Sequence, residues 1–431
     1  MITSCCHANA WEGKGKMHQL SWFDPSTAHG RAELTMTNCV HYDSVFTLFH
    51  STPLGRRGKI VTPHGVIDTP CFMPVATSGA MKGIRHDDLV SLGADILLCN
   101  TYHLHVRPGE SIVQEAGGLH SFIGWEKPII TDSGGFQVFS LRGISRIADE
   151  GVHFQSHLDG SALFIGPEES MRIQHTLGSD IILCFDHCPP SKADRAEQVA
   201  AVDRTLRWAV ECKRVHERLK NQRNQKSQRK QGSDVDGALK RDQHHSSESS
   251  VSSDSLLFGI VQGGLERDLR QKCAEELIAI GFDGYAVGGL AVGETPEEMY
   301  DVLDFVCPIL PADKPRYLMG VGRLEQLRAA VAKGIDMFDC VSPMREARHG
   351  TIYLSDASKL RMSGGVFSHD HSVIDAHSPS PLSRLHLKSY LRHLLSIGER
   401  YGETIACLQN IGVTLEMMKG LREHMEKTEA P

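Results

Sequence analysis

The sequence of 431 residues lacks any run of 18 consecutive apolar residues, so no segment is a candidate transmembrane helix. Its first 43 residues also lack the apolar core of about 7 to 15 residues that a secretory signal peptide needs. Neither sign of charge dominates, because the formal net charge is only -7, and the total charge therefore indicates no nucleic-acid partner. These absences predict a cytoplasmic protein.

A paired cysteine framework is also missing. The twelve cysteines are scattered, and several lie inside apolar runs, namely Cys71, Cys99, Cys184, Cys307 and Cys340. Cysteines in such places are typical of small buried hydrophobic residues in a reducing compartment, so we predict no disulfide framework.

Basic residues are concentrated in one part of the chain. Residues 314–400 hold 13 lysines and arginines against 8 acidic residues. This region is a candidate phosphate-facing surface, although an ordinary solvated face explains the same charges.

Two segments are polar and have no periodicity. Residues 1–43 predict an N-terminal extension that is partly disordered, and residues 220–255, rich in Ser, Gln, Lys and Arg, predict a disordered insertion. We expect one domain over residues 44–415, with a C-terminal subdomain from about residue 350. Residues 416–431 are expected to end the last helix and form a tail.

Eight short apolar runs alternate with stretches of helical spacing inside this domain. The runs occupy residues 71–77, 95–101, 127–135, 180–186, 257–264, 285–293, 316–322 and 337–341. Segments between them, such as 167–178, 267–281 and 324–334, have helical periodicity and end on glycine. Eight such repeats predict an α/β fold, the (β/α)8 TIM barrel, and a doubly wound open sheet is the alternative.

Polar residues end several of these runs, and they include Asn100, Asp132, Asp186, Gln262 and Asp339. The carboxyl ends of barrel strands form the catalytic face, so these side chains are predicted to meet at one mouth. Taken singly, Asp132 or Asp186 is equally well explained as a turn or capping residue. Asp339 stands inside the apolar stretch MFDCV, where a carboxylate needs hydrogen-bond partners or a reactive role.

Together these motifs resemble those of tRNA-guanine transglycosylases, also called queuine tRNA-ribosyltransferases, from about residue 52 to residue 415. The segments concerned include NTYHLHVRPG, TDSGGFQVFSL, CFDHCPP, FGIVQGG, VGGLAVGE, PRYLMGVG and DMFDCVSPMREARHGTIY. The resemblance implies a pentosyltransferase of queuosine biosynthesis that exchanges the wobble guanine, at position 34 of tRNAs with GU(N) anticodons, for a 7-deazaguanine. It also implies N-terminal antiparallel strands, a C-terminal helical subdomain and a homodimer.

Base exchange requires cleavage of an N-glycosidic bond through a transition state with oxocarbenium character, which a carboxylate opposite the departing base can capture. Asp339 matches the family's nucleophile, which implies a covalent Asp339–ribosyl intermediate and a second displacement that restores the original anomer. Asp132 matches the general acid/base that moves the proton of the leaving and entering bases.

The resemblance assigns base recognition to the same mouth. Asp186 is suited to accept hydrogen bonds from N1–H and the 2-amino group, Gln262 to bond the six-position oxygen, and the Gly289 N–H to add a donor. Phe136 and Met319 match the two residues that sandwich the base, although core packing is the ordinary role of a methionine. The full base-binding set comprises Asp132, Ser133, Gly134, Gly135, Phe136, Asp186, Gln262, Gly289 and Met319.

The tRNA contacts of the family fall on two segments of the basic region. These are Gly320, Val321, Gly322, Arg323, Leu324, Glu325 and Gln326, and then Met344, Arg345, Glu346, Ala347 and Arg348. Arg345 and Arg348 are suited to phosphate contact. Met344 and Glu346 depart from the common family pattern Thr-Arg-Asn-Ala-Arg.

The identity of the incoming base depends on three further residues. Val292 and Cys188 match the bacterial-type pocket, which takes 7-aminomethyl-7-deazaguanine. His187 stands where the bacterial pattern has a glutamate, and an imidazole disfavours an aminomethyl cation. Queuine is therefore the alternative incoming base.

Family members hold a structural zinc through three cysteines and a histidine. Ser378, Ser380, Ser383 and Gln409 stand at those positions, and hydroxyl and amide groups are poor zinc ligands. We therefore predict no zinc and no other cofactor.

Three other interpretations are open. An inactive tRNA-binding paralogue has no need to keep Asp339 together with Asp132, Asp186 and Gln262. An archaeal-type transglycosylase would carry additional C-terminal RNA-binding domains, and a barrel glycosidase for small sugars would not involve nucleic acid.

Overall fold

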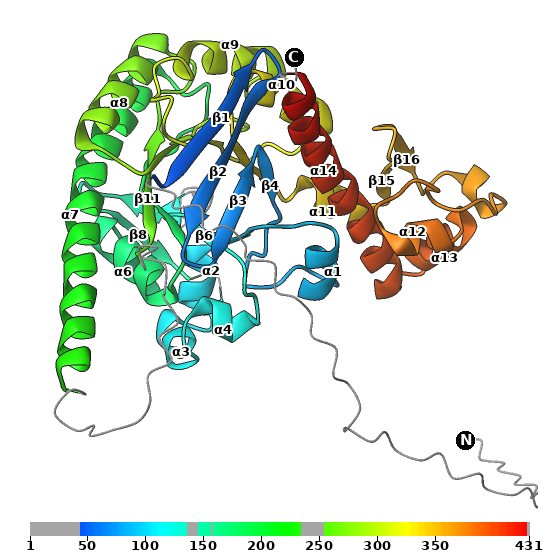
Figure 1. Cartoon of the computed structure of the whole chain (residues 1–431), viewed down its shortest axis with the longest axis horizontal. Coiled ribbons are helices and arrows are strands. Elements are labelled where there is room, and N and C mark those ends of the chain that lie inside the picture. The colour runs from blue at the N-terminus through cyan, green and yellow to red at the C-terminus, as the bar shows by residue number, and fades with distance from the viewer. Residues whose placement is uncertain (1–43, 136–144, 157, 234–253, 429–431) are drawn as a thin grey trace, which may run out of the picture. The chain divides into compact units, whose positions relative to one another are not determined.

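The computed structural model describes residues 44–135, 145–156, 158–233 and 254–428, and its centre is a barrel of eight parallel strands (Figure 1). A parallel bridge between Val75 and Leu98 joins the two edges of the sheet. Each of the eight predicted runs overlaps one strand, so the predicted barrel is confirmed and the open sheet was wrong. In sheet order the strands are β4 (Cys71–Met73), β14 (Met337–Asp339), β13 (Arg316–Leu318), β12 (Gly284–Val287), β11 (Leu256–Val261), β10 (Ile181–Leu183), β6 (Ile129–Thr131) and β5 (Leu97–Cys99).

Alternate residues of each strand point into the barrel, as the twofold period of a strand requires. Ile181 and Leu183 of β10 belong to the interior cluster, whereas Ile182 between them packs against the outer helices. An antiparallel sheet supplies three more residues of the interior cluster, Phe46, Ile60 and Ile67. This sheet consists of β1 (Phe46–Thr52), β2 (Gly55–Thr62) and β3 (Gly65–Thr69), the N-terminal antiparallel strands that were predicted.

A local sequence signal marks the start of one helix of the outer layer. Helix α9 starts with a capping box, in which Thr295 Oγ1 accepts from the Glu298 N–H and Glu298 Oε2 accepts from the Thr295 N–H. The helices between strands are α1 (His86–Ser91), α2 (Thr101–Val106), α3 (Glu110–Glu115), α4 (Leu119–Ile123), α6 (Pro167–Leu177), α7 (Arg195–Ser233), α8 (Arg267–Ile280), α9 (Pro296–Val306), α10 (Leu324–Ala332) and α11 (Ser342–Arg348).

Beyond the barrel, the long helix α14 (Arg400–Thr428) lies between the barrel and a lobe of short elements (Figure 1). The middle of this helix is buried on all sides, from Ile405 to Leu415, because it packs on both neighbours. The lobe contains β15 (Thr351–Tyr353), β16 (Lys359–Arg361), η1 (Gly365–Ser368), α12 (Pro381–Leu385) and α13 (Lys388–Ser396). A further antiparallel sheet, absent from the sequence prediction, is formed by β7 (Ser145–Ile147), β8 (Val152–Gln155) and β9 (Ala162–Ile165).

Helix α7 continues through residues 220–233, where the sequence analysis expected the start of a disordered insertion. Residues 195–231 contain neither proline nor glycine, so nothing in this stretch stops the helix. Residues 234–253 and the predicted extension at 1–43 lie outside the described residues. Among the residues that the structure describes, no helix has the length and apolar character needed to cross a membrane.

Candidate active site

Four of the predicted polar residues meet at the carboxyl-terminal mouth of the barrel. Asp132 follows β6, Asp186 follows β10, Gln262 follows β11 and Asp339 ends β14. Parallel strands of a closed barrel bring these positions to one face although they are far apart in sequence.

Asp339 is held through one of its two carboxylate oxygens. The Tyr317 hydroxyl and the Gly320 N–H both donate to Asp339 Oδ1, at 2.6 and 2.8 Å. Burial raises the pKa of Asp339, and the hydrogen bonds from Tyr317 and Gly320 lower it in part. Within the described part of the chain no hydrogen bond reaches Oδ2, and the residue is partly exposed. An anchored carboxylate with one available oxygen is suited to nucleophilic attack.

Asp132 is buried and ordered by the end of the adjacent strand β5. Asn100 Nδ2 donates to Asp132 Oδ2 at 2.5 Å, and the Thr101 N–H donates to Oδ1 at 2.8 Å. Burial raises the pKa of the Tyr317 phenol, and the negative charges of Asp339 and then Asp132 raise it further. Tyr317 thus lies within electrostatic reach of both carboxylates.

Asp186 and Gln262 form a buried hydrogen-bonded pair. Gln262 Nε2 donates to Asp186 Oδ2 at 2.7 Å, and Ser133 Oγ donates to Oδ1 at 3.1 Å. Burial raises the pKa of Asp186 to about 6, and the charge of Asp132 adds to the rise. The side-chain oxygen of Gln262, Oε1, is buried without a hydrogen-bond partner among the described residues. This pair presents a carboxylate and an amide with unused bonding capacity.

Two glycines pack closely against this pair. A β-carbon on Gly289, whose φ is 65°, would lie 2.4 Å from Gln262 Oε1. A β-carbon on Gly135 would lie 2.9 Å from the Asp186 carbonyl oxygen. Any larger residue at either position would displace the groups that face the mouth.

Of the two residues predicted to stack on the base, the structure describes only Met319. Phe136 lies outside the described residues. Met319 is partly buried and packs against the interior cluster of the barrel, next to the mouth. Ser133, Gly134 and Gly135 are buried in the loop after β6.

The predicted tRNA-binding segments are only partly accessible. Gly320, Arg323, Glu325 and Arg345 are exposed, and Gln326, Glu346 and Arg348 are half-buried. Glu346 Oε2 accepts from the Tyr353 hydroxyl at 3.0 Å and pairs with Lys359 at 3.3 Å. The other five residues of these segments are buried, namely Val321, Gly322, Leu324, Met344 and Ala347.

Two residues of the predicted base pocket, His187 and Cys188, follow β10. Burial raises the pKa of the Cys188 thiol to about 12, so this thiol is neutral. Arg204 on α7 donates to His187 Nδ1 at 3.0 Å, and a guanidinium cannot accept, so this imidazole nitrogen is unprotonated. A cationic side chain therefore stands behind His187.

Ser378, Ser380, Ser383 and Gln409 are brought together as a buried cluster in the C-terminal lobe. Ser378 Oγ donates to Gln409 Oε1 at 2.5 Å, and Gln409 Nε2 donates to the Tyr353 carbonyl at 2.7 Å and to Asp375 Oδ2 at 3.0 Å. The Ser380 and Ser383 hydroxyls are buried without a partner in the described ranges. Neutral hydroxyls and an amide do not fit zinc, which needs thiolate or imidazole donors.

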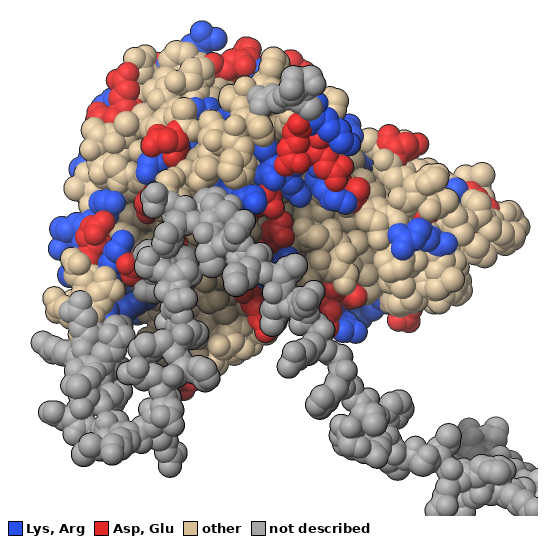
Figure 2. Space-filling model, in the orientation of Figure 1, with Lys and Arg blue, Asp and Glu red and all other residues tan. Residues whose placement is uncertain are grey.

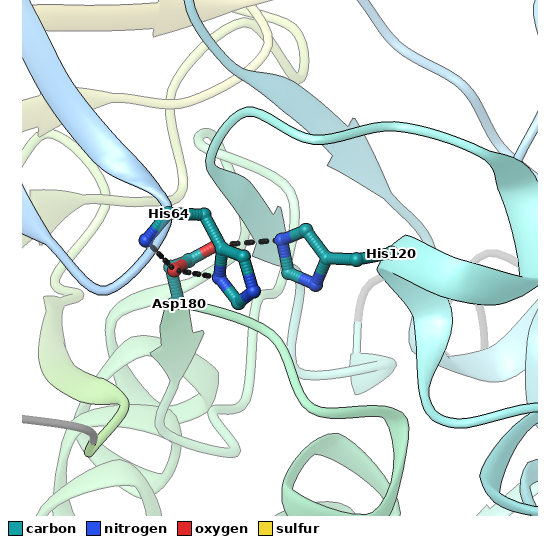
Figure 3. Close-up of side chains that lie close together, drawn as sticks. All are labelled: His64, His120 and Asp180. Atoms are coloured by element: carbon teal, nitrogen blue, oxygen red, sulfur yellow. Dashed lines mark hydrogen bonds and ion pairs between the residues drawn. The ribbon is translucent and has the colours of Figure 1, made fainter. Parts of the chain in front are cut away.

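Among the described residues, the side chains of His64, His120 and Asp180 are of the types that bind metals and lie close together (Figure 3). They stand at the amino-terminal end of the barrel. His64 Nδ1 and His120 Nε2 lie 2.7 and 2.9 Å from different oxygens of Asp180, and the His64 and Ile129 N–H groups also donate to it. The two rings stack 3.5 Å apart, so their nitrogen lone pairs run side by side and do not converge on one ion. This group is a hydrogen-bonded clamp.

Sequence reasoning missed two residues that support the site. Tyr317 anchors Asp339, yet within RYLMGVG it is an ordinary aromatic strand residue. Arg270 on α8 is fully buried beside Gln262, yet its sequence context, RDLRQK, is that of an exposed helix face. Only strand alternation, which points Tyr317 inward, offered a signal.

The chain is similar to a single family over most of its length. Residues 51–431 match the family model described as Queuine tRNA-ribosyltransferase. A queuine tRNA-ribosyltransferase of Halothermothrix orenii is 45% identical over 379 residues, which cover 88% of this chain and 92% of the relative. Those of Shouchella clausii and Clostridium perfringens are 44% and 42% identical, covering 90% and 88% of this chain and 93% and 94% of the relatives.

Proposed function

The chain belongs to the queuine tRNA-ribosyltransferase family of pentosyltransferases that act on tRNA, and from this premise we propose its specific reaction. It exchanges guanine at position 34 of tRNAs with GU(N) anticodons for 7-aminomethyl-7-deazaguanine, in queuosine biosynthesis in the cytoplasm. The observation that carries this proposal is Asp339, with Oδ1 anchored by Tyr317 and Gly320 and Oδ2 left for the ribose.

The reaction proceeds by two displacements at C1′ of the ribose. In the first, Asp339 Oδ2 bonds to C1′ while the C1′–N9 bond breaks, and the electron pair leaves with the guanine. In the second, N9 of the incoming base attacks C1′ and releases the Asp339 carboxylate. Two inversions restore the original anomer.

Asp132 balances the protons of the two steps. Its carboxyl group gives a proton to the leaving guanine, and the resulting carboxylate takes a proton from the entering base. The hydrogen bonds from Asn100 and from the Thr101 N–H support this role, because they orient both carboxylate oxygens.

Asp186, Gln262 and Gly289 read the flipped base along its edge. The Asp186 carboxylate accepts from N1–H and the 2-amino group, so base binding strengthens as the pH rises through the Asp186 pKa of about 6. Gln262 Nε2 exchanges its bond to Asp186 for one to the six-position oxygen, to which the Gly289 N–H also donates.

The neutral Cys188 and the half-buried Val292 support 7-aminomethyl-7-deazaguanine as the incoming base. Queuine is the second candidate, because His187 with Arg204 behind it suits the hydroxyl groups of that larger base better than a primary ammonium. Competition of each base with labelled guanine distinguishes the two.

No zinc takes part in this proposal. The buried bonds among Ser378, Gln409, Tyr353 and Asp375 join helix α14 to the C-terminal lobe, the connection that zinc supplies in the family. The protein acts as a homodimer, and exposed apolar side chains on the lobe support this assignment.

The test is incorporation of radiolabelled guanine into tRNA that lacks queuosine. Wild-type protein is expected to incorporate label and, in a stopped reaction without incoming base, to form a covalent adduct with tRNA. Asp339→Asn and Asp339→Ala are expected to lose both, whereas Asp304→Asn, a change at an exposed aspartate on α9, keeps both. A wild-type protein without incorporation, or an Asp339→Ala protein that still forms the adduct, overturns the proposal.

A further inference from the structure

Arg270 is a fully buried cation that lies directly behind the mouth of the barrel. Its guanidinium donates to four main-chain carbonyls, those of Val261 (2.7 Å), Gly264 (2.9 Å), Gly288 (2.8 Å) and Gly289 (3.5 Å). No carboxylate of the described residues shares a hydrogen bond with it. Burial lowers its pKa to about 10, so it keeps its charge at neutral pH.

These carbonyls belong to the segments that carry the base-reading groups. Val261 ends β11 just before Gln262, Gly264 follows Gln262 by two residues, and Gly288 and Gly289 follow β12. The Gly288 carbonyl and the Gly289 N–H are the two ends of one peptide unit. A donor on the carbonyl end polarises the unit and makes its N–H a stronger donor.

We propose that Arg270 is a positioning residue that acts through the Gly288–Gly289 peptide unit on the six-position oxygen of the departing purine. The inference rests on the proposed function. When the C1′–N9 bond breaks, the electron pair spreads over the purine and reaches that oxygen. The polarised Gly289 N–H then meets more negative charge in the transition state than in the ground state.

A merely structural role does not explain why the group is charged. A neutral side chain can fasten two strand ends without the desolvation cost that a buried cation carries. A cation aimed at peptide carbonyls, in contrast, adds positive potential at the place where the leaving base gains negative charge. The two roles differ in what they predict for ligands that lack the oxygen.

The experiment compares two inhibitors of guanine exchange, 7-deazaguanine and 2-amino-7-deazapurine. The second lacks the six-position oxygen and the proton that the oxo form carries on N1, so each inhibition constant is compared between wild type and variant. In Arg270→Met the inhibition constant of 7-deazaguanine is expected to rise about tenfold or more, as for loss of a charge-assisted hydrogen bond. The constant of the analogue without the oxygen changes by no more than about twofold, and kcat for guanine falls roughly 100-fold. Arg270→Lys keeps the charge, so its inhibition constants and kcat are expected to lie between those of wild type and Arg270→Met.

Arg316→Met is the matched control, because Arg316 is a buried arginine at the opposite end of the barrel that donates to the Leu310 carbonyl. Should Arg270→Met fail to fold, Arg270→Lys supplies the same comparison of inhibitors. An equal loss for both inhibitors, or an unchanged kcat, overturns the inference while wild-type incorporation still supports the proposed function. Wild-type protein without incorporation overturns both.

Discussion

The pKa values of two carboxylates of the site, Asp186 and Asp339, are both raised, and for the same reason. Burial raises both pKa values, because the charged form loses its hydration. In the proposed reaction each carboxylate must be ionised, one to accept hydrogen bonds from the base and the other to attack C1′. Their neighbours therefore decide how much activity survives at mildly acidic pH.

Tyr317→Phe tests this dependence. The Tyr317 hydroxyl bonds to the ionised form of Asp339, so its removal raises the Asp339 pKa further. The acid limb of the pH profile of kcat is expected to move upward by about one unit, since a hydrogen bond to a charged group contributes roughly 1.5 to 3 kcal/mol. Loss of activity is then greater at pH 6 than at pH 8.

Tyr285→Phe is the control, because Tyr285 is also a buried barrel tyrosine but packs outward against Phe282. Its pH profile is expected to match wild type. An acid limb that stays in place in Tyr317→Phe contradicts the role of the phenol.

At the scale of elements, a buried glutamine of helix α14 bonds to two parts of the C-terminal lobe. Gln409 bonds to β15 through the Tyr353 carbonyl and to the loop before α12 through Asp375 and Ser378. Gln409→Ala leaves these buried groups without partners, and the free energy of unfolding is expected to fall by about 2 to 4 kcal/mol. Urea denaturation measures the change.

Gln271→Ala, at an exposed helical glutamine that bonds only to Glu275, is expected to change stability by less than about 0.5 kcal/mol. Incubation of the wild type with a strong zinc chelator leaves its unfolding transition in place. One bound zinc per chain, or unfolding by the chelator, contradicts the proposed metal-free connection.

The clamp of His64, His120 and Asp180 joins the β2–β3 turn, helix α4 and strand β10 (Figure 3). Burial opposes ionisation of Asp180, but hydrogen bonds from His120 and His64 outweigh it and lower the Asp180 pKa. A lowered folded-state pKa stabilises the fold above the unfolded value of about 4, and this stabilisation is lost as the pH falls through the folded value.

Asp180→Asn is therefore expected to lower the free energy of unfolding by about 2 kcal/mol at pH 7, because an amide nitrogen then faces a donor. The difference from wild type shrinks as the pH falls toward 3. Asp356→Asn, at an exposed turn, serves as the control. A difference that does not depend on pH argues against an ionised Asp180.

At the scale of the whole molecule, charged side chains are unevenly distributed over the face that Figure 2 shows. Figure 2 shows lysines, arginines and acidic residues of both signs gathered around the C-terminal end of α14, whereas the lobe with α12 and α13 is mainly uncharged. On this lobe His386 contacts both Tyr390 and Tyr401, and Leu385 beside it is 68% exposed. An exposed apolar patch of this kind indicates a protein interface.

We expect wild-type protein to sediment as a dimer and Leu385→Glu to sediment as a monomer, because a buried unpaired carboxylate opposes association. Val210→Glu, an exposed valine on α7, is the control and stays dimeric. Sedimentation velocity at micromolar protein concentration measures the outcome. A monomeric wild type contradicts the proposed homodimer.

Much of this molecule was predictable from its sequence, since strands and helices follow local patterns. The eight apolar runs indicated the eight barrel strands, and strand ends indicated Asp132, Asp186, Gln262 and Asp339, because a parallel barrel collects such residues at one face. The course of α7 beyond residue 219 was not predicted, since polar composition was taken as a sign of disorder.

Only the tertiary structure decided which groups support these residues. The sequence cannot tell a buried Arg270 from a surface arginine, or an inward Tyr317 from a packing one, because their partners are main-chain carbonyls and a carboxylate from other strands. The resemblance placed Ser378 and Gln409 at the family's zinc positions, but the hydrogen bond between them follows from how helix α14 packs. Residue types and spacing determined the chemistry, and packing determined its electrostatic surroundings.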